Sequence, residues 1–433
     1  RIKLKLMIKI LDSKKNNFSS SLDNLLSKRK NKIKFKSNIV INIIRDIKKN
    51  GDKALLKYEK KFGKNSIIFL KHKEIQKQIK NLDKKVKKSI DLAYSRIFKF
   101  HSKQKVKNIF YKDKLQNKLG YKYMPIDSVG IYVPGGTASY PSTVLMNAIP
   151  AIVAGTKKVV MANPGNKGKH NPGVLYAAKK CGIKEIYSIG GAQAVAALAY
   201  GTKKIKKVNK IVGPGNLYVA TAKKEVFGDV GIDMIAGPSE ITVVGDKFSN
   251  PDWIASDLIA QAEHDELSQS ILISKDKKLI NKVQKSVSNQ IIRLPRKLIA
   301  KKSLKSNGIL IYVSSDQKLI EVINKIAPEH LELNIRKYKN IINKIINAGS
   351  VFVGKYSTEA VGDYLAGTNH VLPTSGSAKF SSGLSVYDFY KRISYINLSK
   401  KGIETLGPSV ITLANFEGLE GHAKSVELRI RRK

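Results

Sequence analysis

Residues 127–238 alternate short apolar runs with segments of helical spacing. The apolar runs each lead into a turn that contains glycine or proline, as in SVGIYVPGG, KKVVMANP, KEIYSIGG and VNKIVGPGN. The segments between them carry apolar residues three and four apart, as in STVLMNAIPAIVAGT, PGVLYAAKKCG, AQAVAALAYGT and LYVATAKKEVFG. Strands and helices that alternate at such short intervals predict βαβ units and a parallel, doubly wound sheet.

A second α/β segment follows the first. IDMIAGPSEITVVGD predicts two strands around a Gly-Pro-Ser-Glu turn, and SILIS and GILIYV predict two more strands. Helical spacing over 251–263, 276–293 and 316–326 separates these strands. Residues 346–390 are rich in Gly, Ser, Thr and Tyr, which favours loops and short elements.

The two ends of the chain lack this alternation. Residues 1–120 are rich in lysine and are predicted to be mostly helical, and nothing in them indicates chemistry. The apolar spacing of residues 38–63 predicts a helix with Gly63 as its C-cap. The tail from about residue 390 predicts two helices.

The net charge is unusual for a globular protein. The chain of 433 residues has 80 Lys and Arg against 33 Asp and Glu, which gives +47. Such a charge is compatible with binding to nucleic acid or an anionic membrane. However, the lysines are spread along the whole chain and do not form a stripe among aromatic residues, which make up only 7%. We therefore favour compositional drift and expect neither nucleic acid nor a membrane as a partner.

The apolar content also bears on location. No stretch approaches the roughly 18 apolar residues that a membrane span needs. Lysines interrupt the start, RIKLKLMIKILDS, before the apolar core of a signal peptide can form. The single cysteine, Cys181, rules out an intrachain disulfide framework and a Cys-rich zinc site, and suits a reducing cytosol. We expect a cytoplasmic protein.

Two segments could carry chemistry on adjacent polar residues. In DWIASDLIAQAEHDE, Gln261 and His264 lie three apart near the end of a predicted helix, so both side chains share a face and could hold one ion. In APEHLEL, Glu329 and His330 are neighbours, the usual equipment for moving protons at neutral pH. Each has a plainer interpretation, a solvated helix end for the first and a surface histidine beside an acidic residue for the second.

Two later segments have the same ambiguity. In EAVGDYLAGTNHVLPTSG, Asp363 and His370 lie in a Gly- and Thr-rich stretch, where polar residues either bind ligands or form turns. In NFEGLEGHAKS, Glu417, Glu420 and His422 surround glycines and could be exposed tail. The remaining histidines have Lys-rich surroundings and are expected at the surface; they are His72, His101 and His170.

Three glycine turns form a separate signal. VPGGT, IGGAQ and VGPGN each follow a predicted strand and precede a predicted helix. Such a turn presents backbone N–H groups at a helix N-terminus, which suits a phosphate or pyrophosphate. None of the three is a complete GxGxxG, so the standard dinucleotide motif is missing.

Taken together, these segments resemble the histidinol dehydrogenase family from about residue 30 to the end. The resemblance rests on ordered blocks: VGIYVPGGTASYPSTVLMNAIPA, IGGAQAVAALAYGT, KIVGPGNLYVATAK, IDMIAGPSE, SDLIAQAEHD, APEHLEL, GSVFVG, GDYLAGTNHVLPT and EGLEGHAKSVELR. It implies an oxidoreductase that converts L-histidinol to L-histidine through L-histidinal with two NAD+, the last step of histidine biosynthesis.

The resemblance also implies cofactors and roles. One zinc ion per subunit would be held by Gln261, His264 and Asp363, with His422 from the other subunit of a homodimer. Glu329 and His330 would be the acid–base pair. The substrate would lie among the zinc ligands and their neighbours, namely Ser239, Gln261, His264, His330, Asp363, His370, Glu417 and His422. NAD would contact Tyr132, Gln193 and Asn216. The loop at 161–173 departs from the family's usual Pro-rich turn, which puts NAD affinity in question.

The implied fold is α/β, with two doubly wound, incomplete Rossmann-like domains and helical N-terminal and C-terminal extensions. Residues 127–238 would form the NAD-binding domain. A larger α/β domain with the zinc and catalytic residues would combine 28–126 with 239–388. Residues 1–27 would be an N-terminal extension, and 389–433 a tail exchanged between subunits with shared active sites.

The cysteine count constrains the second oxidation. Many aldehyde oxidations use a Cys nucleophile, but Cys181 precedes a helix-ending glycine, which is a packing position. The implied mechanism therefore uses water: His330 takes the alcohol proton, and Glu329 activates water to hydrate the aldehyde. Three alternatives stay open: a related zinc and NAD dehydrogenase for another amino alcohol, a basic nucleic-acid-binding protein, and an inactive relative.

Overall fold

A five-stranded parallel sheet forms the centre of one unit. The computed structural model describes residues 7–31, 37–135, 140–165 and 169–430. The strand order is β6-β5-β4-β7-β8. The strands are β4 (Ser128–Tyr132), β5 (Lys158–Ala162), β6 (Glu185–Tyr187), β7 (Lys210–Val212) and β8 (Gly231–Ile232). The helices between them are α5 (Pro141–Ala154), α6 (Pro172–Lys180), α7 (Gly191–Tyr200) and α8 (Leu217–Val226). The expected βαβ units are confirmed.

A six-stranded parallel sheet forms the second unit, in the order β1-β11-β10-β9-β12-β13. Its strands are β1 (Lys9–Asp12), β9 (Glu240–Gly245), β10 (Gln269–Ser274), β11 (Ile309–Tyr312), β12 (His330–Asn334) and β13 (Ser350–Val353). Leaving out β1, both sheets run third, second, first, fourth, fifth strand along the chain. Both units are therefore doubly wound with the same incomplete Rossmann order.

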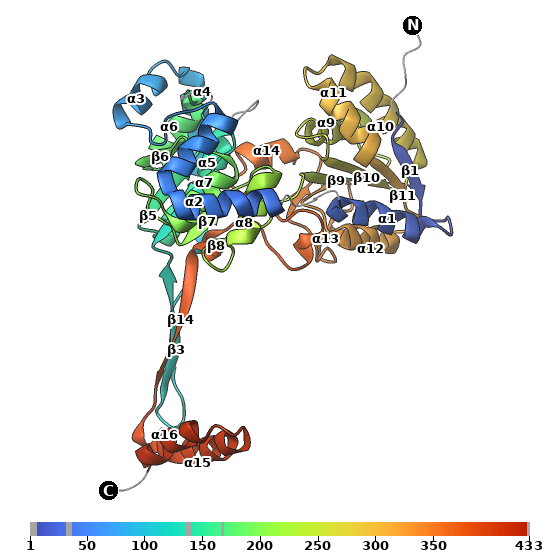
Figure 1. Cartoon of the computed structure of the whole chain (residues 1–433). Helices are drawn as coiled ribbons and strands as arrows, with labels where there is room; N and C mark the ends of the chain where they lie inside the picture. The colour runs from blue at the N-terminus through green and yellow to red at the C-terminus, as the bar shows by residue number, and fades with distance from the viewer. Residues whose placement is uncertain (1–6, 32–36, 136–139, 166–168, 431–433) are drawn as a thin grey trace.

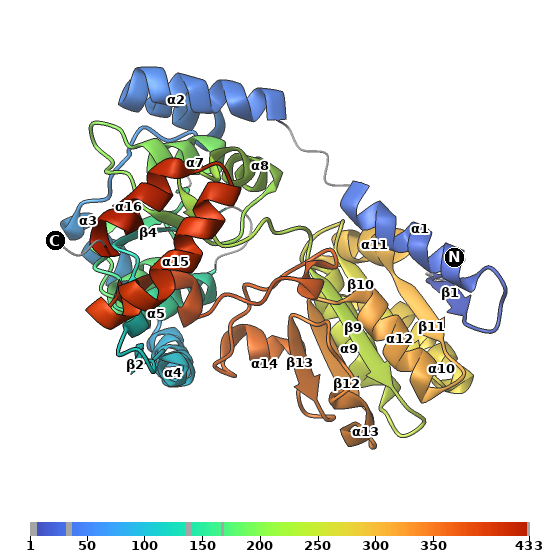
Figure 2. The same cartoon turned by 90° about the horizontal axis from the view of Figure 1, so that it is seen from below.

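Helices and short turns connect the strands of the second unit. They are α9 (Pro251–Ala262), α10 (Lys277–Gln290), η3 (Ile291–Arg293), α11 (Lys297–Asn307), α12 (Asp316–Ile326), α13 (Lys339–Ile342), α14 (Glu359–Tyr364), η4 (Ser377–Lys379) and η5 (Val386–Phe389). Figures 1 and 2 show α10, α11 and α12 against the strands of this unit.

Each sheet is covered on both faces by apolar side chains. Neighbouring residues of one strand belong to different clusters, as Ile131 and Tyr132 of β4 do. Val243 and Val244 of β9 divide in the same way. Burial on both faces explains why the strands have continuous apolar runs and no apolar–polar alternation.

The N-terminal segment divides between the two units. Strand β1 extends the six-stranded sheet by pairing in parallel with β11, and α1 (Phe18–Asn31) follows it. Helices α2 (Ser37–Tyr58), α3 (His72–Ile79) and α4 (Lys84–His101) pack on the five-stranded unit: α2 on α7 and α8, α3 on α6, and α4 on α5 and α6. We expected 28–126 to join the larger domain, but the apolar faces of these helices are buried against the other unit.

The predicted helix over 38–63 is present but changes form at its end. After Tyr58, residues Glu59–Gly63 form a π-helix, η1. The expected C-cap is wrong by one residue, because Lys64 and not Gly63 takes the left-handed conformation. A short 3₁₀ turn, η2 (Ser102–Gln104), closes α4.

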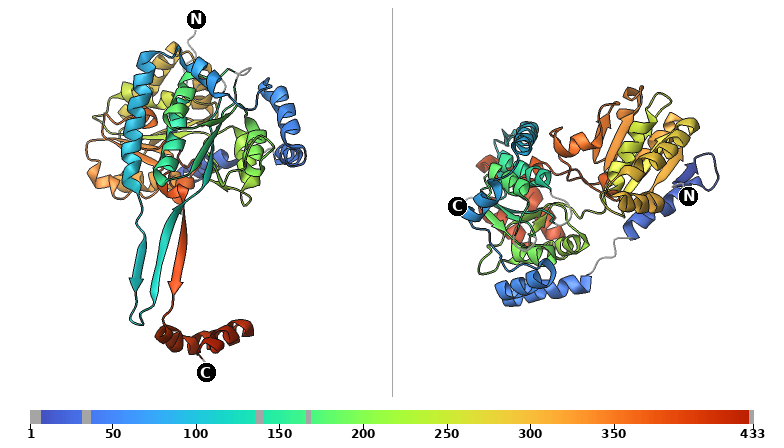
Figure 3. Two further views of the ribbon diagram at one scale, coloured as in Figure 1. Left: turned by 90° about the vertical axis from the view of Figure 1, so that its left-hand side faces the viewer. Right: turned by 90° about the horizontal axis from the view of Figure 1, so that it is seen from above.

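An antiparallel arm was missing from the expected elements. It consists of β2 (Ile109–Lys112), β3 (Lys118–Pro125) and β14 (Tyr390–Asn397), in the order β14-β3-β2. It carries the two predicted tail helices, α15 (Lys400–Phe416) and α16 (Glu420–Ile430), away from both sheets (Figures 1 and 3). Among the described helices, none is long and apolar enough to cross a membrane.

Candidate active site

A cavity of about 480 Å³ lies between the two sheets. Pro134 and Asn216, which follow β4 and β7 of the five-stranded sheet, line one side. Ser239, ahead of β9, and His330, the first residue of β12, line the other side. The carboxyl edge of one sheet therefore faces the amino edge of the other. Because open α/β sheets bind nucleotides at their carboxyl edge, a nucleotide would lie on the five-stranded side.

The imidazole of His330 is buried and held in one orientation. Its Nδ1 lies 3.0 Å from the backbone oxygen of Glu240 and 3.4 Å from Oε1 of Glu359. Both oxygens lie on the Nδ1 side, and the carbonyl can only accept, so the proton of the neutral ring belongs on Nδ1. The Nε2 atom is buried without a hydrogen-bond partner among the described residues. Burial lowers the pKa of His330, so the ring has a free lone pair on Nε2.

Glu329 immediately precedes His330, the first residue of β12. Its Oε2 accepts a hydrogen bond of 2.7 Å from the backbone N–H of Glu240 and lies 3.8 Å from His330 Nδ1. Burial raises the pKa of Glu329 well above its ordinary value. The expected pair thus lies at the cavity as a buried carboxyl group and a neutral imidazole, and such groups exchange protons readily near neutral pH.

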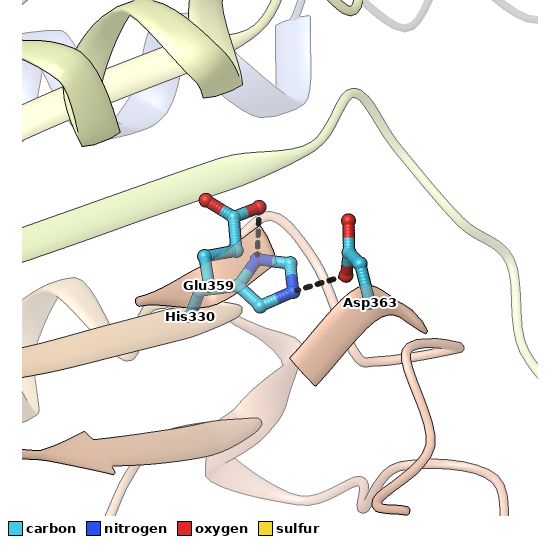
Figure 4. A group of neighbouring side chains, drawn as sticks. All are labelled: His330, Glu359 and Asp363. Atoms are coloured by element: carbon cyan, nitrogen blue, oxygen red, sulfur yellow. Dashed lines mark ion pairs between the residues drawn. The ribbon is translucent and has the colours of Figure 1, made fainter. Parts of the chain in front are cut away.

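Three side chains approach one another closely enough to hold a metal ion. The ligand atoms of His330, Glu359 and Asp363 all lie within 4.8 Å of one another. Figure 4 shows His330 between the two carboxylates, with Nε2 at 3.9 Å from Asp363 Oδ1. Of the expected zinc ligands, this group includes Asp363 only.

The other expected ligands divide into two sets. Gln261 lies at the end of α9 with both amide atoms buried and unpartnered among the described residues. Buried amides are normally hydrogen-bonded, so the unpartnered oxygen of Gln261 is available to bind an ion. His264 lines the cavity three residues further on. Together with Asp363, these residues supply the nitrogen and oxygen donors that zinc accepts, so they fit the implied ion.

His422 lies elsewhere in this chain. It is exposed on α16, at the end of the arm, and Glu417, after α15, is exposed as well. Figure 1 shows both helices at the far end of the arm, away from the two parallel sheets between which the cavity lies. A single chain does not bring these residues to the site.

Ser239 and His370 complete the expected substrate residues, and both line the cavity. His370 is fixed by Nδ1, 3.0 Å from the backbone oxygen of Asp363, and burial lowers its pKa. Its Nε2 lies 3.4 Å from Thr143 Oγ1 of the five-stranded unit.

The expected NAD residues occupy two positions. Asn216 lines the cavity and caps α8. Tyr132 and Gln193 are only 3% and 4% exposed, and Tyr132 Oη accepts a 3.0 Å hydrogen bond from the N–H of Gly191. Both side chains are therefore buried next to the glycine turn that precedes α7. The VPGGT turn and the loop at 161–173 are described only in part, because 136–139 and 166–168 lie outside the described residues.

Two of the histidines expected at the surface are buried, so that prediction is wrong. His101 is fully buried beside Gln104, and His170 contacts Asn163 and Ser188 through its two ring nitrogens. Lysines surround both in the sequence, but lysines near in sequence say nothing about the packing partners that the fold supplies.

Comparison with known proteins now identifies the family. The sequence model of a family described as histidinol dehydrogenase matches residues 26–430. The chain belongs to the histidinol dehydrogenase family. A protein named histidinol dehydrogenase from Pelagibacter ubique is 72% identical over 428 residues, 99% of this chain and 100% of the relative. The protein of that name from Nitrosomonas europaea is 48% identical over 98% of this chain and 100% of its own length.

A solved relative shares the fold. The crystal structure of histidinol dehydrogenase from Elizabethkingia anophelis superposes with a TM-score of 0.90 at 39% identity, covering 98% of both chains. Membership in the histidinol dehydrogenase family confirms the expected resemblance and the α/β fold. It also confirms the enzyme class, an oxidoreductase acting on alcohol and aldehyde groups in histidine biosynthesis.

Glu359 at this candidate site was not expected from the sequence. It is buried, and burial raises its pKa well above the ordinary value. A signal was present: Glu359 and Asp363 are four apart on the short helix α14, a spacing that places both carboxylates on one face.

Proposed function

We propose that this chain is a zinc- and NAD-dependent histidinol dehydrogenase of the cytoplasm, which oxidises L-histidinol through L-histidinal to L-histidine with two NAD+. The observation that carries the proposal is the free Nε2 of buried, neutral His330 in a cavity that also presents Asp363. This arrangement suits removal of a proton from a bound alcohol.

The zinc would be held by Gln261, His264 and Asp363, with His422 of a second copy. A bound zinc ion would anchor the substrate through its amine and imidazole and act as a Lewis acid. His330 would not be a ligand in this proposal, because binding through Nε2 would occupy the lone pair that the proton needs.

The first oxidation would use His330 as the base. Its Nε2 would accept the hydroxyl proton of histidinol while the carbinol carbon loses a hydride, and NAD supplies the hydride acceptor when bound. The backbone oxygen of Glu240 would keep the tautomer fixed and stabilise the imidazolium that forms.

The second oxidation would use Glu329 to activate water. Glu329 would take a proton from water as the water oxygen adds to the aldehyde carbon, and the carbonyl oxygen would take the proton held by His330, giving the hydrate. The hydrate would then pass a hydride to a second NAD+ and a hydroxyl proton to His330. The carboxylic acid that forms would release its remaining proton to solvent, leaving the carboxylate. A thiol route has no group to use: the only cysteine, Cys181, is buried, and burial raises its pKa to about 12.

The active enzyme would be a homodimer with shared sites. The arm and the helices that it carries leave large apolar side chains exposed to water, among them Ile396 of β14 and Leu413 and Phe416 of α15. Exposed apolar groups of this size favour burial against a partner. The same arm carries Glu417 and His422, which have no route to the cavity of their own chain.

The deciding experiment measures NADH formed from L-histidinol by purified protein, before and after chelation and with zinc added back. We expect two NADH per histidinol, loss on chelation and recovery with zinc. If only one NADH formed per histidinol, there would be no second oxidation and Glu329 would not have the proposed role of activating water. Greater activity with a different amino alcohol would identify a related dehydrogenase.

A further inference from the structure

A buried carboxylate from the N-terminal helices reaches the cofactor side of the five-stranded sheet. Glu59, only 1% exposed, begins η1 at the end of α2. Its Oε1 accepts hydrogen bonds of 2.9 Å from the N–H of Gly190 and 2.8 Å from Nε2 of Gln193. It therefore joins the glycine turn before α7 to a side chain expected to contact NAD.

This carboxylate changes what the glycine turn can do. A helix N-terminus in this position normally offers its free N–H groups to a phosphate. Here the N–H of Gly190 is taken by Glu59 and the N–H of Gly191 by Tyr132 Oη. Two of the donors are thus already satisfied by the protein, and the Glu59 carboxyl group already occupies the helix end.

The local backbone is built to admit the carboxylate. A Cβ on Gly63 would lie 2.6 Å from Glu59 Oε2, so a larger residue there would displace this carboxylate oxygen. A Cβ on Gly190 would lie 2.6 Å from Pro164, so the turn is also closely packed from the other side. Single π-turns inside or at the end of α-helices occur frequently at functional sites.

A second turn on the same edge is fixed by a comparable device. Asp233 Oδ2 accepts from the N–H of Gly213 at 2.7 Å, and the buried ammonium of Lys223 pairs with Asp233 and donates to the Gly213 carbonyl. The turns that follow β6 and β7 at the carboxyl edge of the sheet are therefore both held by buried acidic side chains.

We propose that Glu59 is a positioning residue for NAD, which fixes the Gly190–Gly191 turn together with Tyr132 and Gln193 so that the cofactor meets a preformed surface. This inference rests on the proposed NAD-dependent function. Glu59 does not contact the reacting atoms; it acts through the residues it holds.

The test compares three substitutions. Glu59→Ala removes both accepted hydrogen bonds. Glu59→Gln keeps an Oε1 that can accept both, so it separates positioning from charge. Glu185→Ala is the matched control. Glu185 on β6 also interacts with two side chains, since it accepts a hydrogen bond from Tyr187 and pairs with Lys158, but it lies away from the cavity.

The main readout is the affinity for NADH alone, measured by fluorescence titration without substrate. We expect Glu59→Ala to weaken NADH binding about tenfold or more, since a lost hydrogen bond to a charged group costs about that much. KM for NAD should rise while KM for histidinol stays unchanged. The NADH affinity of Glu59→Gln should stay within about threefold of that of the unaltered protein. The NADH affinity of Glu185→Ala should equal that of the unaltered protein.

Several outcomes overturn the inference. Unchanged or tighter NADH binding by Glu59→Ala would mean that the turn does not need the carboxylate. A lower kcat with both KM values unchanged would indicate a purely structural role. Should Glu59→Ala not fold, Glu59→Asp keeps the charge but cannot reach both donors, and the same loss of NADH affinity is expected of it. Failure of the unaltered protein to bind NADH would instead overturn the proposed function, and this inference with it.

Discussion

The chemistry of the site depends on which polar atoms the fold leaves without partners. Nearly all buried polar groups in folded proteins are hydrogen-bonded, yet both amide atoms of Gln261 and Nε2 of His330 are buried and unpartnered among the described residues. Of these atoms, Gln261 Oε1 and His330 Nε2 each have an available lone pair, the first for the proposed zinc ion and the second for the proton of the alcohol. The two possible ligand sets share Asp363: one adds Gln261 and His264, and the other adds His330 and Glu359.

Substitution of these two residues should distinguish the ligand sets. Gln261→Ala removes a proposed ligand and should lower zinc affinity by about 100-fold or more, because even residues that only support a ligand contribute 10–100-fold. Glu359→Gln should keep zinc affinity within about tenfold. Zinc content after dialysis against a competing chelator measures both, with thermal unfolding as a check on folding. Zinc lost from Glu359→Gln but retained by Gln261→Ala would favour His330, Glu359 and Asp363 as ligands.

His170 shows how a buried residue couples the fold to pH. Its ring nitrogens lie 2.8 Å from Asn163 Oδ1 and 3.0 Å from Ser188 Oγ. Burial lowers its pKa from 6.5 to about 4. Between these values the unfolded chain binds a proton that the folded protein does not, so stability falls as the pH is lowered through this interval.

The expected effect is a pH-dependent loss on the order of 3 kcal/mol of unfolding free energy below the folded pKa. Denaturant unfolding of the unaltered protein and of His170→Gln, from about pH 7 to about pH 4.5, measures it. His170→Gln should be less stable at neutral pH but should lose less stability on acidification. His72→Gln, at an exposed position, is the control. Equal pH slopes for all three proteins would show that His170 does not contribute.

At the scale of elements, the sequence predicted those strands, helices and turns that a local pattern of apolar residues determines. The strands β4 to β7 and β9 to β11, the helices between them and the glycine turns were found, because strands buried on both faces give continuous apolar runs. The strands β12 and β13 were not among the expected strands. The strands β2, β3 and β14 were missed, since they project as an arm and have no core to impose a pattern. Strand β1 was missed because it is only four residues long and has charged residues, Lys9 and Asp12, at both ends.

The relation between the two sheets could not be predicted from local pattern. Their strand order follows from contacts between distant segments, and nothing in a single strand shows that one sheet offers its carboxyl edge and the other its amino edge. Glu59 illustrates the same limit, because it lies 131 residues from the turn it holds. The resemblance to the family indicated the expected site residues, but it did not indicate that Glu59 holds the turn at Gly190.

At the scale of the whole molecule, the charge and the arm have different consequences. Two of the ion pairs are buried, Arg29 with Glu240 and Lys223 with Asp233, and each fixes a segment next to the cavity. Most other pairs have exposed partners, which contribute little to stability, so the excess of lysine does not define a site. The arm does have a clear consequence, because it separates His422 from the ligands it is expected to join.

That separation predicts complementation between two inactive variants. His330→Asn removes the base from the body of the chain, and His422→Asn removes the expected ligand from its tail, so each homodimer should be inactive. In a mixed dimer, the body of the His422 variant meets the unaltered tail of the His330 variant, and one of the two sites is intact. Random pairing makes half of the dimers mixed, so co-refolded chains should recover about a quarter of the unaltered activity.

A second pair of variants supplies the control. His330→Asn and Asp363→Asn both alter the body of the chain, so every site in their mixed dimer keeps one defect and activity should stay absent. The measurement is NADH formation after the two chains are refolded together, compared with refolding each alone. No recovery in the pair that joins body and tail would mean that each chain completes its own site. Recovery in the control pair would mean that His330 and Asp363 of one site come from different chains, which contradicts the proposed division into body and tail. Recovery only in the pair that joins body and tail would require the arm to place His422 in the cavity of the partner.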